Sequence, residues 1–69
     1  MSGTTTPELR MAHEIARQFA GRPHDEAVGT IAGHLRKFWA PAMIANLVEE
    51  ADRGADLDPL VAEVVAELR

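Results

Sequence analysis

The sequence predicts an all-α fold, a small bundle of three to four short helices in a single domain. Four prolines stand at positions 7, 23, 41 and 59, and each suits the first turn of a helix. Apolar residues between the prolines recur with a period near 3.6, as on an amphipathic helix. No segment shows the strict alternation of apolar and polar residues that is typical of a half-buried strand.

The first helix is predicted to run from about residue 7 to residue 20. Thr6 suits the N-cap and Pro7 the first helical position, while Gly21 and Pro23 suit the end of the helix. His13 lies at the edge of the apolar stripe, so we expect it to be partly buried and hydrogen-bonded. Residues 1–6 form a short stretch of mostly small polar residues, and a flexible tail is expected there.

The second helix is predicted over about residues 24–39. Asp25 and Glu26 favour its start, because carboxylates stabilise the positive end of the helix dipole. Gly29 and Gly33 lie on the side of the helix away from its apolar stripe. Each glycine costs roughly 1 kcal/mol in a helix interior. They are either tolerated on an exposed face or leave that face bare for another chain.

The third and fourth helices are predicted over about residues 41–53 and 59–68. Pro41 begins the third, and Gly54 suits the residue just past its end. Asp58 and Pro59 form an N-cap and first-position pair for the fourth. Their apolar arcs consist of Met43, Ile44, Leu47, Val48 and Ala51, and of Leu60, Val61, Val64, Val65 and Leu68.

The residue content argues against an independent enzyme. The chain has no cysteine and no tyrosine, and its one serine lies in the expected tail. No phosphate-binding glycine motif is present. His13, His24 and His34 lack the spacing that would place two of them on one helix face. We therefore expect no catalytic, cofactor-binding or metal-binding residue in this chain.

The net charge and the length of the chain further limit the class of protein. The net charge of −4 is unusual for a nucleic-acid-binding protein, which normally carries a basic surplus. No apolar run is long enough for a membrane span, and the N-terminus has no signal-peptide pattern. A cytoplasmic location is expected. With only 69 residues and no disulfide, the chain has little to stabilise it alone, which favours a partner or self-association.

The most distinctive stretch covers residues 33–43, which hold the single tryptophan, one of two phenylalanines and two adjacent basic residues. Aromatic residues and arginine are enriched in protein interfaces. Trp39 either closes the core or shares the task with Phe38, one ring facing inward and the other outward. The predicted partner-binding residues are His34, Arg36, Lys37, Phe38, Trp39, Pro41 and Met43.

From Leu9 onward the sequence resembles the delta subunit of cytoplasmic NAD-dependent formate dehydrogenases, over about 60 of its 69 residues. The strongest block is residues 34–39, His-Leu-Arg-Lys-Phe-Trp, followed by Pro41 and Met43. Residues 9–16, 25–28 and 57–61 are weaker blocks. The family usually has an acid where this chain has Gly33, and acid-Pro-Arg-Met where it has residues 40–43, Ala-Pro-Ala-Met.

The resemblance implies an accessory subunit that has no redox cofactor of its own. It would dock on the catalytic large subunit and support assembly, stability or cofactor insertion, during maturation or in the finished enzyme. In such complexes the bis-molybdopterin guanine dinucleotide, with molybdenum or tungsten, and iron–sulfur clusters belong to the large subunit. FMN and NAD belong to other partner subunits.

Two other functions remain open from the residues alone. The first is a small helical nucleic-acid-binding module that uses Arg22, Arg36 and Lys37. The second is a free-standing structural homodimer that pairs through the face of Gly29 and Gly33. The homodimer is compatible with the accessory role, because an isolated subunit can self-associate through the surface meant for its partner.

Overall fold

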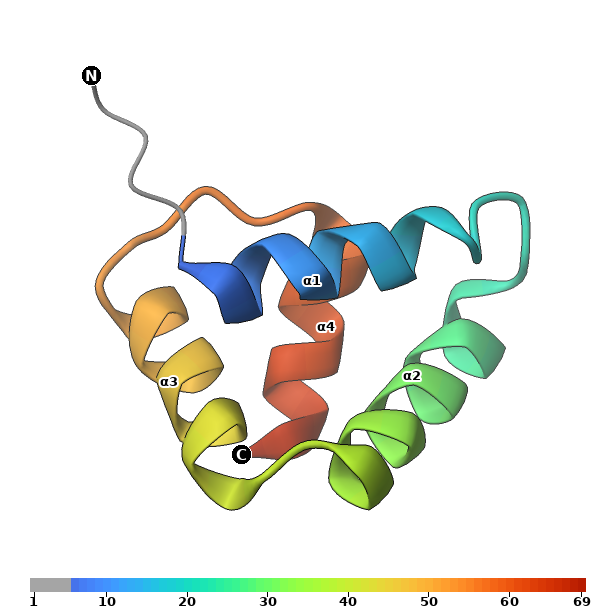
Figure 1. Ribbon diagram of the computed structural model, residues 1–69. Helices are drawn as coiled ribbons and strands as arrows, with labels where there is room; N and C mark the ends of the chain where they lie inside the picture. The colour runs from blue at the N-terminus through green and yellow to red at the C-terminus, as the bar shows by residue number, and fades with distance from the viewer. Residues whose placement is uncertain (1–5) are drawn as a thin grey trace.

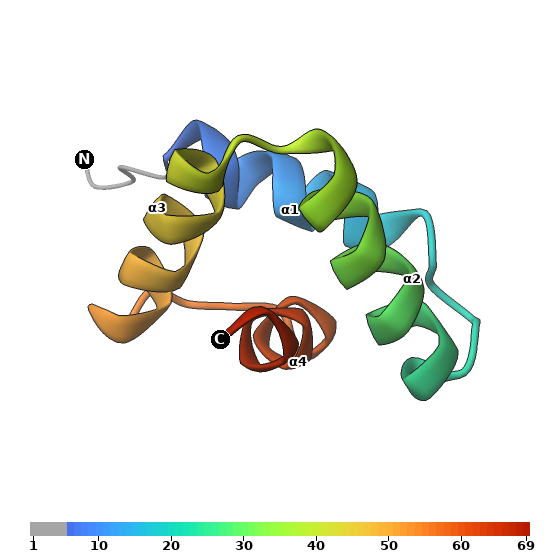
Figure 2. The same ribbon diagram turned by 90° about the horizontal axis from the view of Figure 1, so that it is seen from below.

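The computed structural model describes residues 6–69 and contains four helices in this range, which confirms the predicted all-α bundle. They are α1 (Pro7–Arg17), α2 (His24–Phe38), α3 (Pro41–Asp52) and α4 (Pro59–Leu68). Helix α1 crosses α4 steeply, and α2 and α3 diverge on either side of α4 (Figures 1 and 2). The predicted flexible tail lies almost wholly outside the described residues; only Thr6 of it is described.

The helix starts follow from local capping. The hydroxyl of Thr6 accepts a hydrogen bond from the Leu9 backbone N–H at 3.2 Å, and the Asp58 carboxylate accepts one from Leu60 at 2.8 Å. Both caps precede a proline at the first helical position, where the missing N–H costs nothing. These contacts confirm the predicted N-caps of α1 and α4.

Three helix ends fall short of the predicted ones. Helix α1 stops at Arg17, because residues 18–20 change to tighter turns in which each N–H bonds to the carbonyl three residues earlier. Helices α2 and α3 each end one residue early. Gly21 and Gly54 follow α1 and α3 with φ of 90° and 89°, backbone conformations that suit glycine at a helix end.

A single hydrophobic core joins the four helices. Helix α2 packs most extensively against α4, which contributes four buried residues. Helix α3 contributes one buried residue, Leu47. The core consists of Leu9, Ala12, Ala16, Ala27, Ile31, Ala32, Leu35, Trp39, Leu47, Leu60, Val61, Val64 and Val65. Among residues 6–69 it contains no buried polar or charged side chain.

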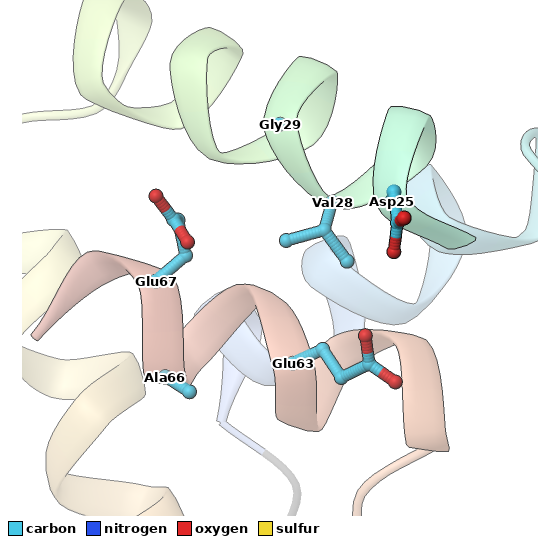
Figure 3. Close-up of a pocket in the computed structure, with 6 residues that line it drawn as sticks. All are labelled: Asp25, Val28, Gly29, Glu63, Ala66 and Glu67. Atoms are coloured by element: carbon cyan, nitrogen blue, oxygen red, sulfur yellow. The ribbon is translucent and has the colours of Figure 1, made fainter. Parts of the chain in front are cut away.

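The two glycines of α2 lie on an exposed face. A Cβ built at Gly29 or Gly33 meets no atom within 4 Å other than its local neighbours, so no close packing within this chain requires them. Gly29 borders an open groove of about 540 Å³ between α2 and α4, together with Asp25, Val28, Glu63, Ala66 and Glu67 (Figure 3). Three carboxylates therefore rim this groove.

Replacing Gly29 or Gly33 by alanine is expected to stabilise the monomer by up to about 1 kcal/mol each, because alanine has the higher helix propensity and finds free space. In a chain of this size, 1 kcal/mol corresponds to a rise of about 4–8 °C in Tm. Thermal unfolding followed by circular dichroism measures this shift. Gly54→Ala is the control, and it should lower the Tm because of its positive φ.

Candidate functional site

The predicted partner-binding residues lie where α2 ends and α3 begins. We call residues 33–44 the α2–α3 corner. Helix α2 ends at Phe38, and Trp39 leaves the helix with extended backbone angles, φ −91° and ψ 143°. Pro41 then begins α3. The residue before a proline avoids helical angles, and Ala40 accordingly has φ −65° and ψ 149°.

One of the two large aromatic rings of the corner is buried and the other is exposed. Trp39 is buried, with 8% of its surface exposed, and belongs to the core, whereas Phe38 is 68% exposed. The structure therefore realises the division in which one ring faces inward and the other outward. Trp39 can offer a partner only the small part of its surface that remains exposed, and Phe38 is the exposed aromatic group.

Phe38 contacts its neighbour one turn earlier. The His34 and Phe38 rings lie with their centroids 4.8 Å apart and tilted by 44°. Such aromatic pairs attract each other beyond the effect of the area that they bury. Lys37 is exposed beside this pair. Among residues 6–69, Phe38 and Met11 are the large hydrophobic residues that are exposed, and Met11, at 44%, is the less exposed of the two.

The remaining corner residues face a different side. Arg36 is exposed and donates a hydrogen bond at 2.7 Å to the backbone carbonyl of Glu67, near the end of α4. Arg36, Trp39 and Pro41 line a hollow of about 300 Å³ together with Ile44 and Leu68. Met43 is half-buried and packs against the core.

Ile44 and Leu68 are lining residues that the sequence pattern does not indicate. Their apolar periodicity marked both only as core positions of α3 and α4. Leu68 comes from the far end of the chain, and no local pattern indicates that α4 ends beside the α2–α3 corner. Only the tertiary arrangement brings these residues together.

Charge is distributed unevenly around the molecule. All eleven acidic residues of the chain lie outside residues 27–48, where Arg36 and Lys37 are the charged residues. The rest of the chain carries five basic residues against those eleven acidic ones. The segment that forms the corner is therefore basic in an acidic chain, whereas three carboxylates rim the groove of Figure 3.

An ion pair fixes the C-terminal end of α4 against α3. Arg69 donates a hydrogen bond to the Asp52 carboxylate at 2.6 Å. This hydrogen bond holds the pKa of Asp52 below its ordinary value and raises the pKa of Arg69. Leu68, the residue before Arg69, packs against the core.

The lowered pKa of Asp52 predicts a small acid sensitivity. A carboxyl group whose pKa is lower in the folded chain stabilises the fold above its ordinary pKa, and this contribution is lost as the pH falls through the lowered value. Replacing Arg69 by glutamine should return the pKa of Asp52 towards its ordinary range. A carboxyl titration by NMR measures this change, and an unshifted Asp52 in the unsubstituted chain would contradict the ion pair.

The histidines of the chain take separate structural roles. His13 is half-buried, and its Nε2 accepts a hydrogen bond from the Asp58 backbone N–H at 3.2 Å, which confirms its expected position at the edge of the core. His24 pairs with Glu63 at 3.0 Å. Within residues 6–69, no group of three or more His, Cys, Asp or Glu side chains gathers as a metal site would require.

Arg22, grouped in the sequence with Arg36 and Lys37 as a nucleic-acid patch, lies elsewhere. It sits before the start of α2, with its guanidinium 5.4 Å from the centre of the Phe19 ring. Thirteen residues of α2, His24 to Arg36, lie between it and Lys37, a distance of roughly 20 Å at 1.5 Å per residue. The three cations therefore do not form one patch.

The fold and the site define a small helical domain with a locally basic corner and an exposed aromatic group. Residues 9–65 match the family described as NADH-dependent formate dehydrogenase delta subunit FdsD, and the chain belongs to this family. It is thus a delta subunit of NAD-dependent formate dehydrogenase. Comparisons with curated proteins and with solved structures gave no match. No helix among the described residues is long and apolar enough to cross a membrane.

Proposed function

We propose that this chain is a non-catalytic accessory subunit that docks on the catalytic large subunit of formate dehydrogenase through the α2–α3 corner. In this role it supports the assembly or stability of the complex, or the insertion of its cofactor. The redox cofactors then belong to the partner subunits, and the complex works in the cytoplasm.

The observation that carries this proposal is the exposed Phe38 ring, which is 68% accessible and in tilted contact with the His34 ring. A large apolar ring in water gains free energy when a partner covers it, at ~25 cal/mol per Å² of apolar surface. Phenylalanine and arginine are both enriched in interfaces, whereas lysine is not. Membership of the family indicates formate dehydrogenase as the complex, and the exposed Phe38 ring is a surface that a partner subunit could contact.

The corner also suits docking because its order does not depend on the partner. Trp39 anchors it in the core, Pro41 fixes the start of α3, and Arg36 ties the end of α2 to α4. A preorganised surface loses little conformational entropy when it binds. The backbone that carries Phe38 is therefore held by its neighbours on both sides.

Binding of purified chain to the purified catalytic subunit tests the proposal. Phe38→Asp should weaken binding about 30-fold or more, because loss of an interface hot spot costs about 2 kcal/mol or more. Ala62→Asp is the matched control, since it adds the same charge at an exposed position of α4. Equal binding by Phe38→Asp and the unsubstituted chain would contradict docking through the corner.

A second measurement separates a permanent subunit from a maturation factor. A maturation factor binds the catalytic subunit before its cofactor is inserted and leaves afterwards. A permanent subunit remains in equal proportion in the active complex. Purified active enzyme is therefore analysed for this chain, alongside catalytic subunit produced in cells that cannot make the molybdopterin cofactor.

The nucleic-acid function is less well supported than docking on a protein. The chain is acidic overall, and Arg22 lies apart from Arg36 and Lys37.

The homodimer alternative is tested by measuring the mass of the purified chain at micromolar concentration in sedimentation equilibrium. Pairing that survives Phe38→Asp would place the contact on another face, such as that of Gly29 and Gly33.

A further inference from the structure

The hollow beside Trp39, described above by its five lining residues, is open to solvent and has room for one side chain. Its volume of about 300 Å³ is at the lower limit for pockets that hold small molecules. Trp39, Pro41, Ile44 and Leu68 give it apolar walls, and Arg36 is its charged residue. We call it the Trp39 socket.

Each wall of the Trp39 socket is fixed by a separate structural feature. The extended backbone at residue 39 turns the indole into the core, so that only its remaining exposed surface borders the socket. Pro41 and Ile44 lie on the first turn of α3. Leu68 is the last residue of α4 and packs against the core. The socket is therefore present before any partner arrives.

Arg36 gives the socket a chemical preference. The hydrogen bond to the Glu67 carbonyl orients its guanidinium and uses one of five N–H groups. A guanidinium fork matches a carboxylate with two parallel hydrogen bonds. Arg36 takes part in none of the ion pairs within residues 6–69, and the Glu67 carboxylate lies at the rim of the separate α2–α4 groove (Figure 3).

We propose that the Trp39 socket receives an apolar side chain of the catalytic subunit, adjacent to an aspartate or glutamate whose carboxylate pairs with Arg36. This inference rests on the proposed docking and adds the chemistry of the partner segment. Phe38 and the socket then act as two separate contacts on one corner: Phe38 inserts into the partner, and the partner inserts into the socket.

Two substitutions test the two halves of the socket in binding to the purified catalytic subunit. Leu68→Trp fills the socket, and Arg36→Lys keeps the charge but loses the planar fork. Each is expected to weaken binding at least tenfold. Arg17→Lys, at an exposed arginine of α1, is the control and should change binding less than threefold. Circular dichroism checks that each variant keeps its helices.

A cross-link identifies the partner segment directly. The chain has no cysteine, so Leu68→Cys provides a single attachment point for a photoreactive maleimide. After irradiation of the complex, peptide mass spectrometry should find the label on a segment of the catalytic subunit with an apolar residue next to Asp or Glu. A label on a basic segment, or on a second copy of this chain, would overturn the proposal.

The outcomes separate this inference from the proposed function. If Phe38→Asp abolishes binding while Leu68→Trp and Arg36→Lys bind as the unsubstituted chain does, the socket proposal is wrong and docking through the corner stands. If none of the three variants changes binding, both proposals are wrong. Loss of binding in all three, with a cross-link to an apolar and acidic segment, supports both.

Discussion

Replacing Trp39 by alanine is expected to lower the free energy of unfolding by about 3–5 kcal/mol, the range for truncating a buried aromatic residue. Trp39 is 8% exposed and closes the core at the point where α2 leads into α3. Its loss removes a large apolar area from the core and opens a cavity among three helix ends. A small domain holds only a few kcal/mol of stability, so the variant should be largely unfolded at 37 °C.

Urea unfolding followed by circular dichroism measures this loss. Phe38→Ala is the matched control, because it removes the neighbouring aromatic ring from an exposed position. It should change stability by about 0.5 kcal/mol or less. Equal losses for the two variants would contradict the inward and outward placement of the rings. The pair also separates folding from docking, since Phe38→Ala should weaken binding in a folded chain.

Leu47→Ala is expected to cost about 2–5 kcal/mol, the range for truncating a buried leucine. Leu47 is completely buried and is the buried residue of α3, whose other apolar residues are only partly covered. The variant should therefore loosen α3 more than α2 or α4. Amide hydrogen exchange by NMR measures this as a larger loss of protection in α3 than in α4.

The control for Leu47→Ala is its neighbour Asn46, whose exposed side chain donates a hydrogen bond to Glu8 at 3.3 Å. Asn46→Ala should cost about 0.5 kcal/mol or less, because a hydrogen bond to water replaces the lost one. Uniform loss of protection across all four helices in Leu47→Ala would show that α3 cannot open separately from the rest of the core.

The starts of the helices could be predicted because their signals are local. Thr6 and Asp58 cap the helices that Pro7 and Pro59 begin, and these contacts involve residues two or three positions apart. The ends of the helices were less predictable. After Arg17 the chain continues in tighter turns, yet Phe19 still packs against the core. The apolar pattern therefore extends past the end of the helix and does not mark where the helix stops.

The placement of the aromatic rings needed the structure. On a regular helix Phe38 and Trp39 fall within one apolar stripe, so the pattern alone could not choose between them. The choice follows from Pro41, which excludes helical angles at Ala40, while Trp39 already has extended angles and thus leaves the helical stripe. The contacts of Arg36 with Glu67 and of Arg69 with Asp52 span 31 and 17 residues, beyond any local signal.

The uneven distribution of charge has a consequence for the speed of complex formation. An acidic surface on a partner repels most of this chain, with its eleven carboxylates, and attracts the corner that bears Arg36 and Lys37. Approaching molecules are therefore turned towards productive orientations before they touch. Salt shortens the range of this field to about 8 Å at physiological ionic strength. Added salt should therefore slow the encounter more than it shortens the lifetime of the complex.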